Sequence, residues 1–286
     1  MTAPFGARLA GAMDRLGPLC VGIDPHPGLL AAWGLADDAE GLRRFALTVV
    51  EALVGQVAAL KPQAAFFERH GWRGIAVLEE VLGAVRGEAT QVILDAKRGD
   101  IGSTMAGYGD AYLAPGAPMA CDALTVSPYL GVGALTPVVA AAEAAGRGLF
   151  VLALTSNPEG ASVQHAIAPD DRAVAAGVAS QVAALNARAL AAEPAPLGPH
   201  GLVVGATVGD AVRRLGIDLA GVRGPLLAPG VGAQGAGATE LADVFGGARR
   251  AVLASTSRAV LDAGPGVGQL RDAAARNLDD VSRALR

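Results

Sequence analysis

The sequence predicts a (β/α)8 TIM barrel, and three observations lead to this prediction. Eight short apolar runs recur along the 286 residues, most are followed by a segment with apolar residues at helical spacing, and the runs are almost continuously apolar. Such runs are typical of parallel strands that helices cover. Eight alternating units in a chain of this length favour a closed barrel. A doubly wound open sheet is the second choice, because it usually needs fewer strands.

The predicted strands follow one another along the whole chain. They are LCVGID (19–24), VAALKPQ (57–63), QVILDAK (91–97), ALTVSP (123–128), GLFVLALTS (148–156), GLVVGAT (201–207), PLLAPGV (225–231) and AVLASTS (251–257). Helical spacing is clearest in 41–56, 74–85 and 173–190. The Pro-rich stretch 193–199 is short enough to be a loop. We therefore expect a single TIM-barrel domain over residues 1–286.

Composition excludes several classes of protein. Hydrophobic residues make up 52% of the chain, which is enough for a sizeable core, and charged residues only 17%, with a formal net charge of -4. Such a chain has no basic field to hold a nucleic-acid backbone or an anionic membrane. Two cysteines, Cys20 and Cys121, and four histidines supply neither a disulfide framework nor a zinc-site spacing. A reducing, cytoplasmic location fits these counts.

We expect no targeting or membrane segment. Arg8, Asp14 and Arg15 interrupt the N-terminal apolar runs, so the apolar core of a signal peptide is missing there. The longest uncharged stretch, 123–142, has the length of a membrane span, but Pro128 and Pro137 divide it into a strand, a loop and the start of a helix.

Polar residues gather at the predicted carboxyl ends of the strands, where a (β/α)8 barrel places its chemistry. In chain order they are Asp24, Lys61, Asp95, Lys97, Ser127, Thr155, Ser156, Thr207, Ser257 and Arg258. Polar residues at strand ends also commonly bond to loop backbone. For Asp24 or Ser127 alone, that structural role explains the residue as well as a functional role does.

Lysine is rare in this chain. Of 23 basic residues, only Lys61 and Lys97 are lysines, and both fall at predicted strand ends. Arginine cannot release a proton near neutral pH, whereas a lysine ammonium can act as an acid. Their retention in an Arg-rich chain indicates such a role, although survival by chance is the alternative.

The third run ends in D-x-K-x-x-D, formed by Asp95, Lys97 and Asp100. Side chains two apart on a strand point to the same face, so Asp95 and Lys97 can touch. Carboxylates a few ångströms away favour the charged ammonium, so Lys97 is suited to give a proton to a carbanion. With Lys61 on the neighbouring strand, an alternating Lys/Asp array becomes possible. A buried structural ion-pair network is the alternative.

The seventh run leads into PGVGAQG (229–235), whose glycines match G-x-G-x-x-G. A Rossmann dinucleotide site fails on context, because one strand remains and no acidic residue lies about 20 positions on. A Gly-rich loop after the seventh strand, with Ser257 and Arg258 after the eighth, is where barrels commonly bind phosphate. Arg258 can add a bidentate clamp and Gln234 an amide donor. A tight loop without a ligand is the alternative.

These motifs resemble those of a known family. D-x-K-x-x-D-I-x-x-T, formed by Asp95, Lys97, Asp100, Ile101 and Thr104, together with PGVGAQG and the late Ser-Arg, is similar to orotidine 5'-phosphate decarboxylases. TVSPYLG and LTSNPEG resemble the longer bacterial branch, type 2. The resemblance runs from Asp24 to Arg258. It implies a TIM-barrel homodimer that converts orotidine monophosphate (OMP) to UMP in pyrimidine synthesis, without a metal ion or an organic cofactor.

The resemblance also implies roles around the reacting carbon. Lys97 is the implied proton donor to C6, and Asp95 lies against the departing carboxylate. Lys61 holds Asp95 and a ribose hydroxyl, while Asp24 binds the ribose. Losing CO2 from C6 leaves a carbanion with no electron sink, so a site that supplies both charge stabilisation and a proton fits this chemistry.

Further roles follow from the same resemblance. Asp100 and Thr104 reach the neighbouring subunit's site, so the dimer is required for activity. Ser127 is assigned a hydrogen bond to the pyrimidine. The motif of the fourth strand, which carries this role, differs between branches of the family. Gln234 and Arg258 hold the phosphate. The shorter branches carry other residues between Lys97 and Asp100, so the details of this loop do not transfer.

Two other functions stay open from the sequence. A related barrel enzyme, such as 3-keto-L-gulonate 6-phosphate decarboxylase, uses the same D-x-K-x-x-D with Mg²⁺, but the second lysine and the TVSPY loop argue against it. An idle nucleotide-binding barrel would be expected to have lost acid/base residues. All four, Lys61, Asp95, Lys97 and Asp100, are present.

Overall fold

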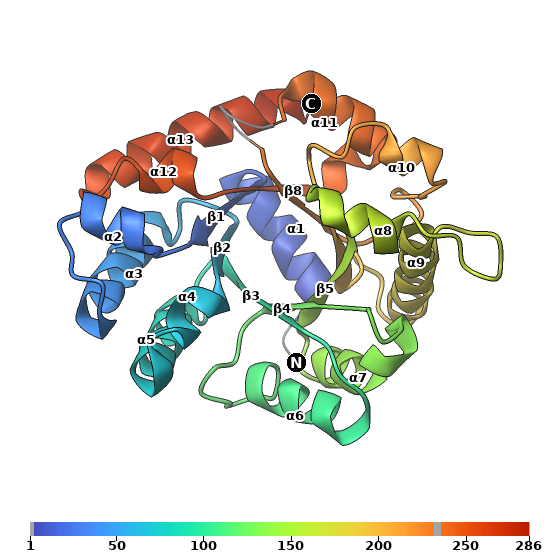
Figure 1. Cartoon of the computed structure of the whole chain (residues 1–286), viewed down its shortest axis with the longest axis horizontal. Helices are drawn as coiled ribbons and strands as arrows, with labels where there is room; N and C mark the ends of the chain where they lie inside the picture. Colours follow the sequence, from blue (N-terminus) through green and yellow to red (C-terminus); the bar gives the residue numbers. More distant parts are fainter. Residues whose placement is uncertain (1–2, 232–235, 286) are drawn as a thin grey trace.

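Eight parallel strands form a closed barrel in the computed structural model, which describes residues 3–231 and 236–285 (Figure 1). The strands are β1 (Leu19–Ile23), β2 (Ala59–Pro62), β3 (Gln91–Arg98), β4 (Ala123–Val126), β5 (Gly148–Leu154), β6 (His200–Val204), β7 (Leu226–Pro229) and β8 (Val252–Thr256). Each strand pairs in parallel with the next, and β8 closes the ring by pairing with β1 at Leu19↔Ala254. The predicted fold class is confirmed.

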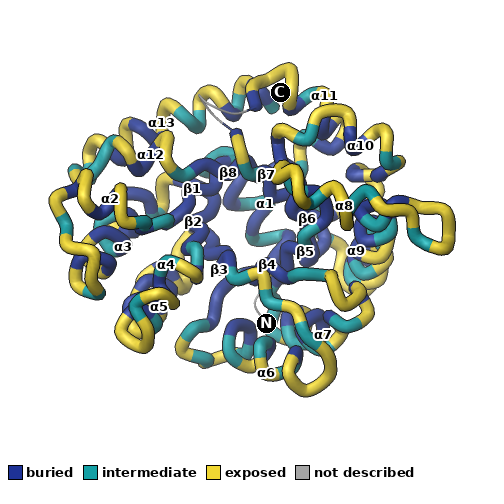
Figure 2. The backbone as a smooth tube through the Cα atoms, in the orientation of Figure 1, coloured by how far each residue is buried: buried dark blue, intermediate teal, exposed yellow. Residues whose placement is uncertain are grey.

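Helices surround the barrel. They are α2 (Pro27–Ala32), α3 (Ala39–Leu53), α4 (Ala64–Glu68), α5 (Gly71–Val85), α6 (Gly102–Tyr112), α7 (Thr136–Ala144), α8 (Ala161–Gln164), α9 (Val174–Ala192), α10 (Ala211–Arg214), α11 (Ala238–Phe245), α12 (Arg258–Leu261) and α13 (Val267–Ala284). The three segments with the clearest helical spacing correspond to α3, α5 and α9. Figure 2 shows buried strands inside a ring of helices whose exposed residues face outward. Full burial explains why the strand sequences do not alternate.

Most strands end one to three residues before the predicted position. Ser127, Thr155 and Ser257 therefore lie in the loops that follow β4, β5 and β8. These polar residues lie just after the last paired residue of each strand, at the rim of the barrel. The third strand differs, because β3 continues to Arg98 through a register shift between Leu94 and Arg98.

An N-terminal helix, α1 (Phe5–Leu16), closes the floor of the barrel. Its buried residues share one core with inward-facing residues of all eight strands, namely Cys20, Ala59, Ile93, Ala123, Phe150, Val203, Leu227 and Leu253. The Phe5 and Phe150 rings meet edge to face at 6.0 Å. Gly148 permits this approach, since a Cβ there would lie 2.1 Å from the Phe5 ring. The opposite, carboxyl end of the barrel is thereby left for ligands.

We expect Phe5→Ala to lower the free energy of unfolding by about 3–5 kcal/mol, because the ring is fully buried and its loss leaves a cavity. Urea denaturation followed by circular dichroism measures this change. Trp72→Ala is the matched control, since Trp72 is 72% exposed and its removal should change stability little. Equal losses for the two variants would contradict the role of α1 as the floor.

One helix within the described residues, α9, is long and apolar enough to cross a membrane, judged by length and composition alone. It packs against β5 and β6 as one of the covering helices of the barrel. Cys20 and Cys121 are buried and unpaired, and burial raises the pKa of each thiol to about 12.

Candidate active site

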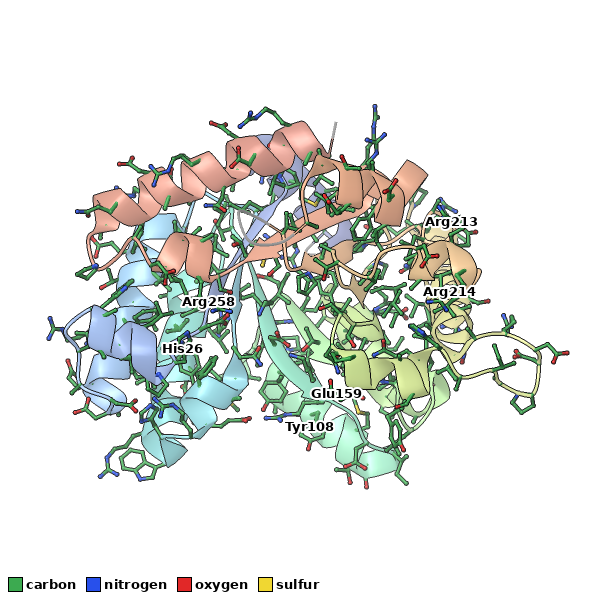
Figure 3. The ribbon with its side chains drawn as sticks, turned by 45° about the horizontal axis from the view of Figure 1, so that its top comes forward. His26, Tyr108, Glu159, Arg213, Arg214 and Arg258 are labelled. Carbon is green, nitrogen blue, oxygen red and sulfur yellow. The ribbon has the colours of Figure 1, made fainter. Side chains whose placement is uncertain are left out.

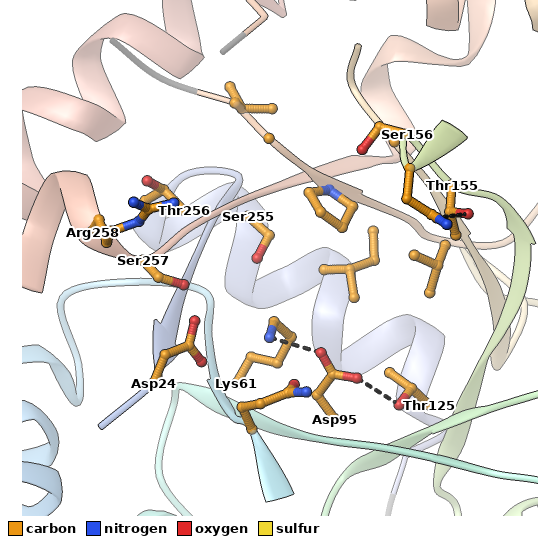
Figure 4. A pocket seen from close by; sticks show the side chains of 18 of the residues that line it. Asp24, Lys61, Asp95, Thr125, Thr155, Ser156, Ser255, Thr256, Ser257 and Arg258 are labelled. Atoms are coloured by element: carbon orange, nitrogen blue, oxygen red, sulfur yellow. Dashed lines mark hydrogen bonds and ion pairs between the residues drawn. The ribbon is translucent and has the colours of Figure 1, made fainter. Parts of the chain in front are cut away.

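A polar cavity of about 910 Å³ opens at the carboxyl end of the barrel (Figure 4). Side chains from or just after β1, β2, β3, β4, β5 and β8 line it, including Asp24, Lys61, Asp95, Lys97, Thr125, Thr155, Ser156, Ser255, Ser257 and Arg258. Most residues predicted from the strand ends are thus brought together. Thr207 is not among them, because it lines a second cavity with Asp210 and Arg213.

A charged array lies on the β2–β3 side of this cavity. Lys61 Nζ is 2.9 Å from Asp95 Oδ2, and Lys97 Nζ is 2.6 Å from Asp95 Oδ1. Lys61 and Asp95 are buried, whereas the Lys97 side chain is 46% exposed. One carboxylate therefore holds two ammonium groups, of which Lys97 is the more accessible to a ligand.

The backbone at Lys97 departs from a regular strand. Lys97 has a φ of 48°, in the left-handed region that non-glycine residues rarely adopt. The expected contact between Lys97 and Asp95 is present, but it forms at a strand irregularity and not by simple alternation of side chains. Sparsely populated backbone conformations of this kind cost about 1–3 kcal/mol and cluster at functional sites.

Thr125 completes the array, although no sequence motif predicts it. Its hydroxyl donates to Asp95 Oδ1 at 2.9 Å and accepts the backbone N–H of Lys97, also at 2.9 Å. The hydroxyl thus fixes both the carboxylate and the unusual Lys97 backbone. The pairing register of β3 and β4 would have predicted this contact. Ile93 pairs with Ala123, so Thr125 lies beside Asp95.

Asp95 and Lys61 stay charged over a wide pH range. Burial alone would raise the pKa of Asp95, but Lys61 and Lys97 outweigh it and lower the pKa from 3.8 to about 2. Burial would lower the pKa of Lys61, but Asp95 and Asp24 raise it above 10.5. The contribution to stability is therefore fully present between about pH 4 and pH 10, and declines as pH falls toward 2 or rises past 10.5.

The two lysines can be observed one at a time, because the chain has no others. Protein labelled with ¹³C at lysine Cε should give two side-chain NMR signals, which Lys97→Ala assigns. We expect Lys61 to stay an ammonium beyond pH 10.5, and to titrate at lower pH in Asp95→Asn, where burial persists without its partner. Titration of wild-type Lys61 at or below 10.5 would contradict this electrostatic description.

Across the cavity, Asp24 and Ser257 lie close together at the β1–β8 side (Figure 4). Gly22 makes room for both, since a Cβ there would lie 2.1 Å from Ser257 Oγ and 3.0 Å from Asp24 Oδ2. Asp24 Oδ1 is buried and has no hydrogen-bond partner among the described residues. Buried polar atoms are nearly always satisfied, so a ligand hydroxyl is a fitting partner for this oxygen.

Arg258 lies at the start of α12, beside the barrel mouth (Figure 3). It is exposed and lines the same cavity as Gly230, whose φ of 89° suits the turn after β7. Gln234, the predicted amide donor of this loop, lies outside the described residues, as do the other residues of 232–235. The described part of the predicted phosphate end thus consists of Gly230, Ser257 and Arg258.

Three predicted site residues do not line the cavity of the single chain. Asp100 follows β3, and its carboxylate accepts the backbone N–H of Ile101 at 2.8 Å. Thr104 is exposed on α6. Ser127 follows β4 and donates its backbone N–H to the carbonyl of Arg98 at 2.8 Å. Asp100 and Thr104 are available to a ligand or a partner outside this cavity.

Comparisons with known proteins point to one family. The family model described as "Orotidine 5'-phosphate decarboxylase / HUMPS family" matches residues 17–273. Orotidine 5'-phosphate decarboxylases of Salinispora arenicola and Streptomyces coelicolor are 60% identical over 281 residues and 56% identical over 282, covering 98% and 99% of this chain and 98% of each relative.

A solved structure gives the same result in three dimensions. A crystal structure of a protein from Streptomyces avermitilis is 56% identical to this chain, with a TM-score of 0.93, and the match covers 99% of this chain and 96% of that one. The chain belongs to the orotidine 5'-phosphate decarboxylase / HUMPS family.

Proposed function

We propose that this protein decarboxylates OMP to UMP and CO2, the last step of de novo pyrimidine nucleotide synthesis, in the cytoplasm and without a cofactor. The observation that carries the proposal is one buried carboxylate, Asp95, held between Lys61 and Lys97 in a polar cavity. A protein named for this activity is 60% identical to the chain over 98% of its length.

The chemistry assigned to the array is direct protonation. The bond between C6 and the carboxylate carbon breaks, CO2 leaves, and the electron pair stays on C6. The Lys97 ammonium stabilises that charge and donates its proton to C6, and solvent then restores the proton to the amine. Lys97 suits this role because its side chain reaches the cavity while the carboxylate of Asp95 keeps the ammonium in place.

Asp95 and Lys61 complete the reacting end. Asp95 faces the substrate carboxylate and repels it in the ground state. Lys61 stays charged, holds Asp95 and reaches a ribose hydroxyl. The unpartnered Asp24 Oδ1 accepts a second ribose hydroxyl. Ser127 is assigned to the pyrimidine by family resemblance.

Arg258 and Ser257 hold the phosphate at the far side of the cavity. Gln234, which lies outside the described residues, is assigned to the same phosphate by family resemblance. Guanidinium and phosphate form bidentate charge-assisted hydrogen bonds. Binding energy from this remote group offsets the repulsion at the reacting carbon. A decarboxylase therefore benefits from a phosphate clamp even though the phosphate takes no part in bond breaking.

A homodimer with shared sites completes the proposal. Asp100 and Thr104 lie outside the lining of their own chain's cavity, so they are free to complete a partner's site. Beside them, Ile101 is 63% exposed, Tyr129 78% and Leu130 54%. Large apolar side chains exposed together on adjacent loops are typical of a subunit interface.

Substrate and metal dependence distinguish OMP decarboxylation from the rival function, decarboxylation of a sugar phosphate. Purified protein is given OMP in excess EDTA, and in parallel 3-keto-L-gulonate 6-phosphate with Mg²⁺. We expect turnover of OMP and none of the sugar phosphate. Turnover of the sugar phosphate that EDTA abolishes would support the rival, and binding of UMP without any turnover would support an idle nucleotide-binding barrel.

A further inference from the structure

Arg98, the residue after Lys97, makes contacts that the proposed chemistry does not use. Its guanidinium Nη2 forms an ion pair with Glu68 Oε1, at the end of α4, and donates to the Tyr112 hydroxyl on α6 at 3.4 Å. Although Arg98 lies near the mouth of the barrel, its side chain is only 24% exposed and does not line the cavity. Arg98 therefore links β3 to the helices on both sides of it.

Two aromatic rings hold the same guanidinium. The Arg98 Cζ atom lies 5.6 Å from the centre of the Tyr108 ring and 5.9 Å from that of Tyr112, and the two rings are stacked one turn apart on α6. Tyr108 is labelled in Figure 3. Guanidinium over aromatic faces within about 6 Å is a favourable cation–π geometry. We call Arg98, Glu68, Tyr108 and Tyr112 the arginine clamp.

The main chain of Arg98 is fixed as well. Its carbonyl accepts the backbone N–H of Ser127, while the N–H of Lys97 is held by the Thr125 hydroxyl. The left-handed Lys97 conformation lies between these two bonds. Unfavourable backbone conformations persist where the surroundings determine them on all sides. The arginine clamp adds a restraint from α4 and α6, which lie outside β3 and β4.

We propose that Arg98 is a positioning residue that holds the Lys97 backbone, and thereby the Lys97 ammonium, in its place beside Asp95. This inference rests on the proposed function, because it assigns Arg98 a role in placing the proton donor. A planar guanidinium can pair with Glu68 and stack on the tyrosines at once, whereas a lysine ammonium cannot. The same contacts join β3 to α6, the helix that carries Thr104.

The kinetic test uses Arg98→Met and Glu68→Gln, singly and together. We expect each single variant to lower kcat for OMP about 10- to 100-fold, as small misplacements of a reacting group do, while KM and UMP affinity change less than about threefold. The double variant should be no slower than the slower single variant, because both changes break one unit. Arg98→Lys should have a kcat as low as that of Arg98→Met, because a lysine ammonium cannot replace the guanidinium.

Arg69→Met is the matched control. Arg69 follows Glu68 and forms an ion pair with Asp37 away from β3, so its loss should leave kcat unchanged. Arg98→Met with wild-type kcat would overturn the positioning role. An equal fall in kcat in Arg69→Met would also overturn it. The loss of any positive charge near α4 would then be enough to lower kcat. If Arg98→Met fails to fold, wild-type kcat in Glu68→Gln overturns the role.

A second measurement does not depend on turnover. In protein labelled at lysine Cε, Arg98→Met should shift or broaden the Lys97 signal and leave the Lys61 signal in place. Unchanged signals from both lysines would overturn the proposal. If wild-type protein fails to convert OMP, the proposed function is wrong, and the Lys97 signal still decides whether the clamp positions this lysine.

Discussion

Lys97→Ala should lower kcat for OMP at least about ten-thousandfold, because the variant loses both the general acid and the main charge facing the carbanion. UMP affinity should change only a few-fold, since the phosphate end of the cavity does not involve Lys97. Stopped assays with concentrated enzyme measure the residual rate, and calorimetric titration with UMP measures binding.

Lys97→Arg separates charge from proton transfer. Arginine keeps the positive charge but cannot release a proton near neutral pH, so this variant should remain nearly inactive. Turnover of Lys97→Ala within about tenfold of wild type would remove Lys97 from the role of proton donor, because general acids contribute more than that.

Mixing two inactive variants should restore activity. Lys97→Ala and Asp100→Ala homodimers each lack one essential group in both sites, if Asp100 acts in the partner's site. After random subunit exchange, half of the dimers are heterodimers with one intact site each, so activity should recover to roughly a quarter of wild type. The measurement is OMP turnover after equimolar mixing.

Subunit exchange has to be demonstrated in the same sample, for example by native mass spectrometry of tagged and untagged chains. A control mixture of Lys97→Ala with Asp95→Asn should stay inactive, because both changes fall in the site of their own chain. Exchange without recovery in the first mixture would contradict a shared site.

The barrel itself could be predicted because parallel strands leave a simple record in the sequence. Runs such as QVILDAK are apolar throughout since both faces of the strand are covered, and eight of them fit one closed sheet. The contact between Asp95 and Lys97 was also predictable, because their spacing of two limits how far apart they can lie. The carboxyl ends of parallel strands meet at one end of the barrel, and this rule predicted four further cavity residues, Asp24, Lys61, Ser257 and Arg258.

Other features depend on register and packing, which the sequence does not state directly. Thr125 became part of the array only through the pairing of β3 with β4. The left-handed backbone of Lys97 has no glycine to mark it. The arginine clamp joins residues 30 and 14 positions apart, and α1 fills the floor from the start of the chain. Such contacts arise from tertiary structure, so composition and periodicity leave no trace of them.

The most direct test of this account is conversion of OMP by the purified wild-type protein in excess EDTA. The loss of ultraviolet absorbance of OMP gives the rate, and chromatography identifies the product. The account predicts complete conversion, with one UMP formed for each OMP consumed. Persistence of OMP in the presence of folded, dimeric protein would contradict it.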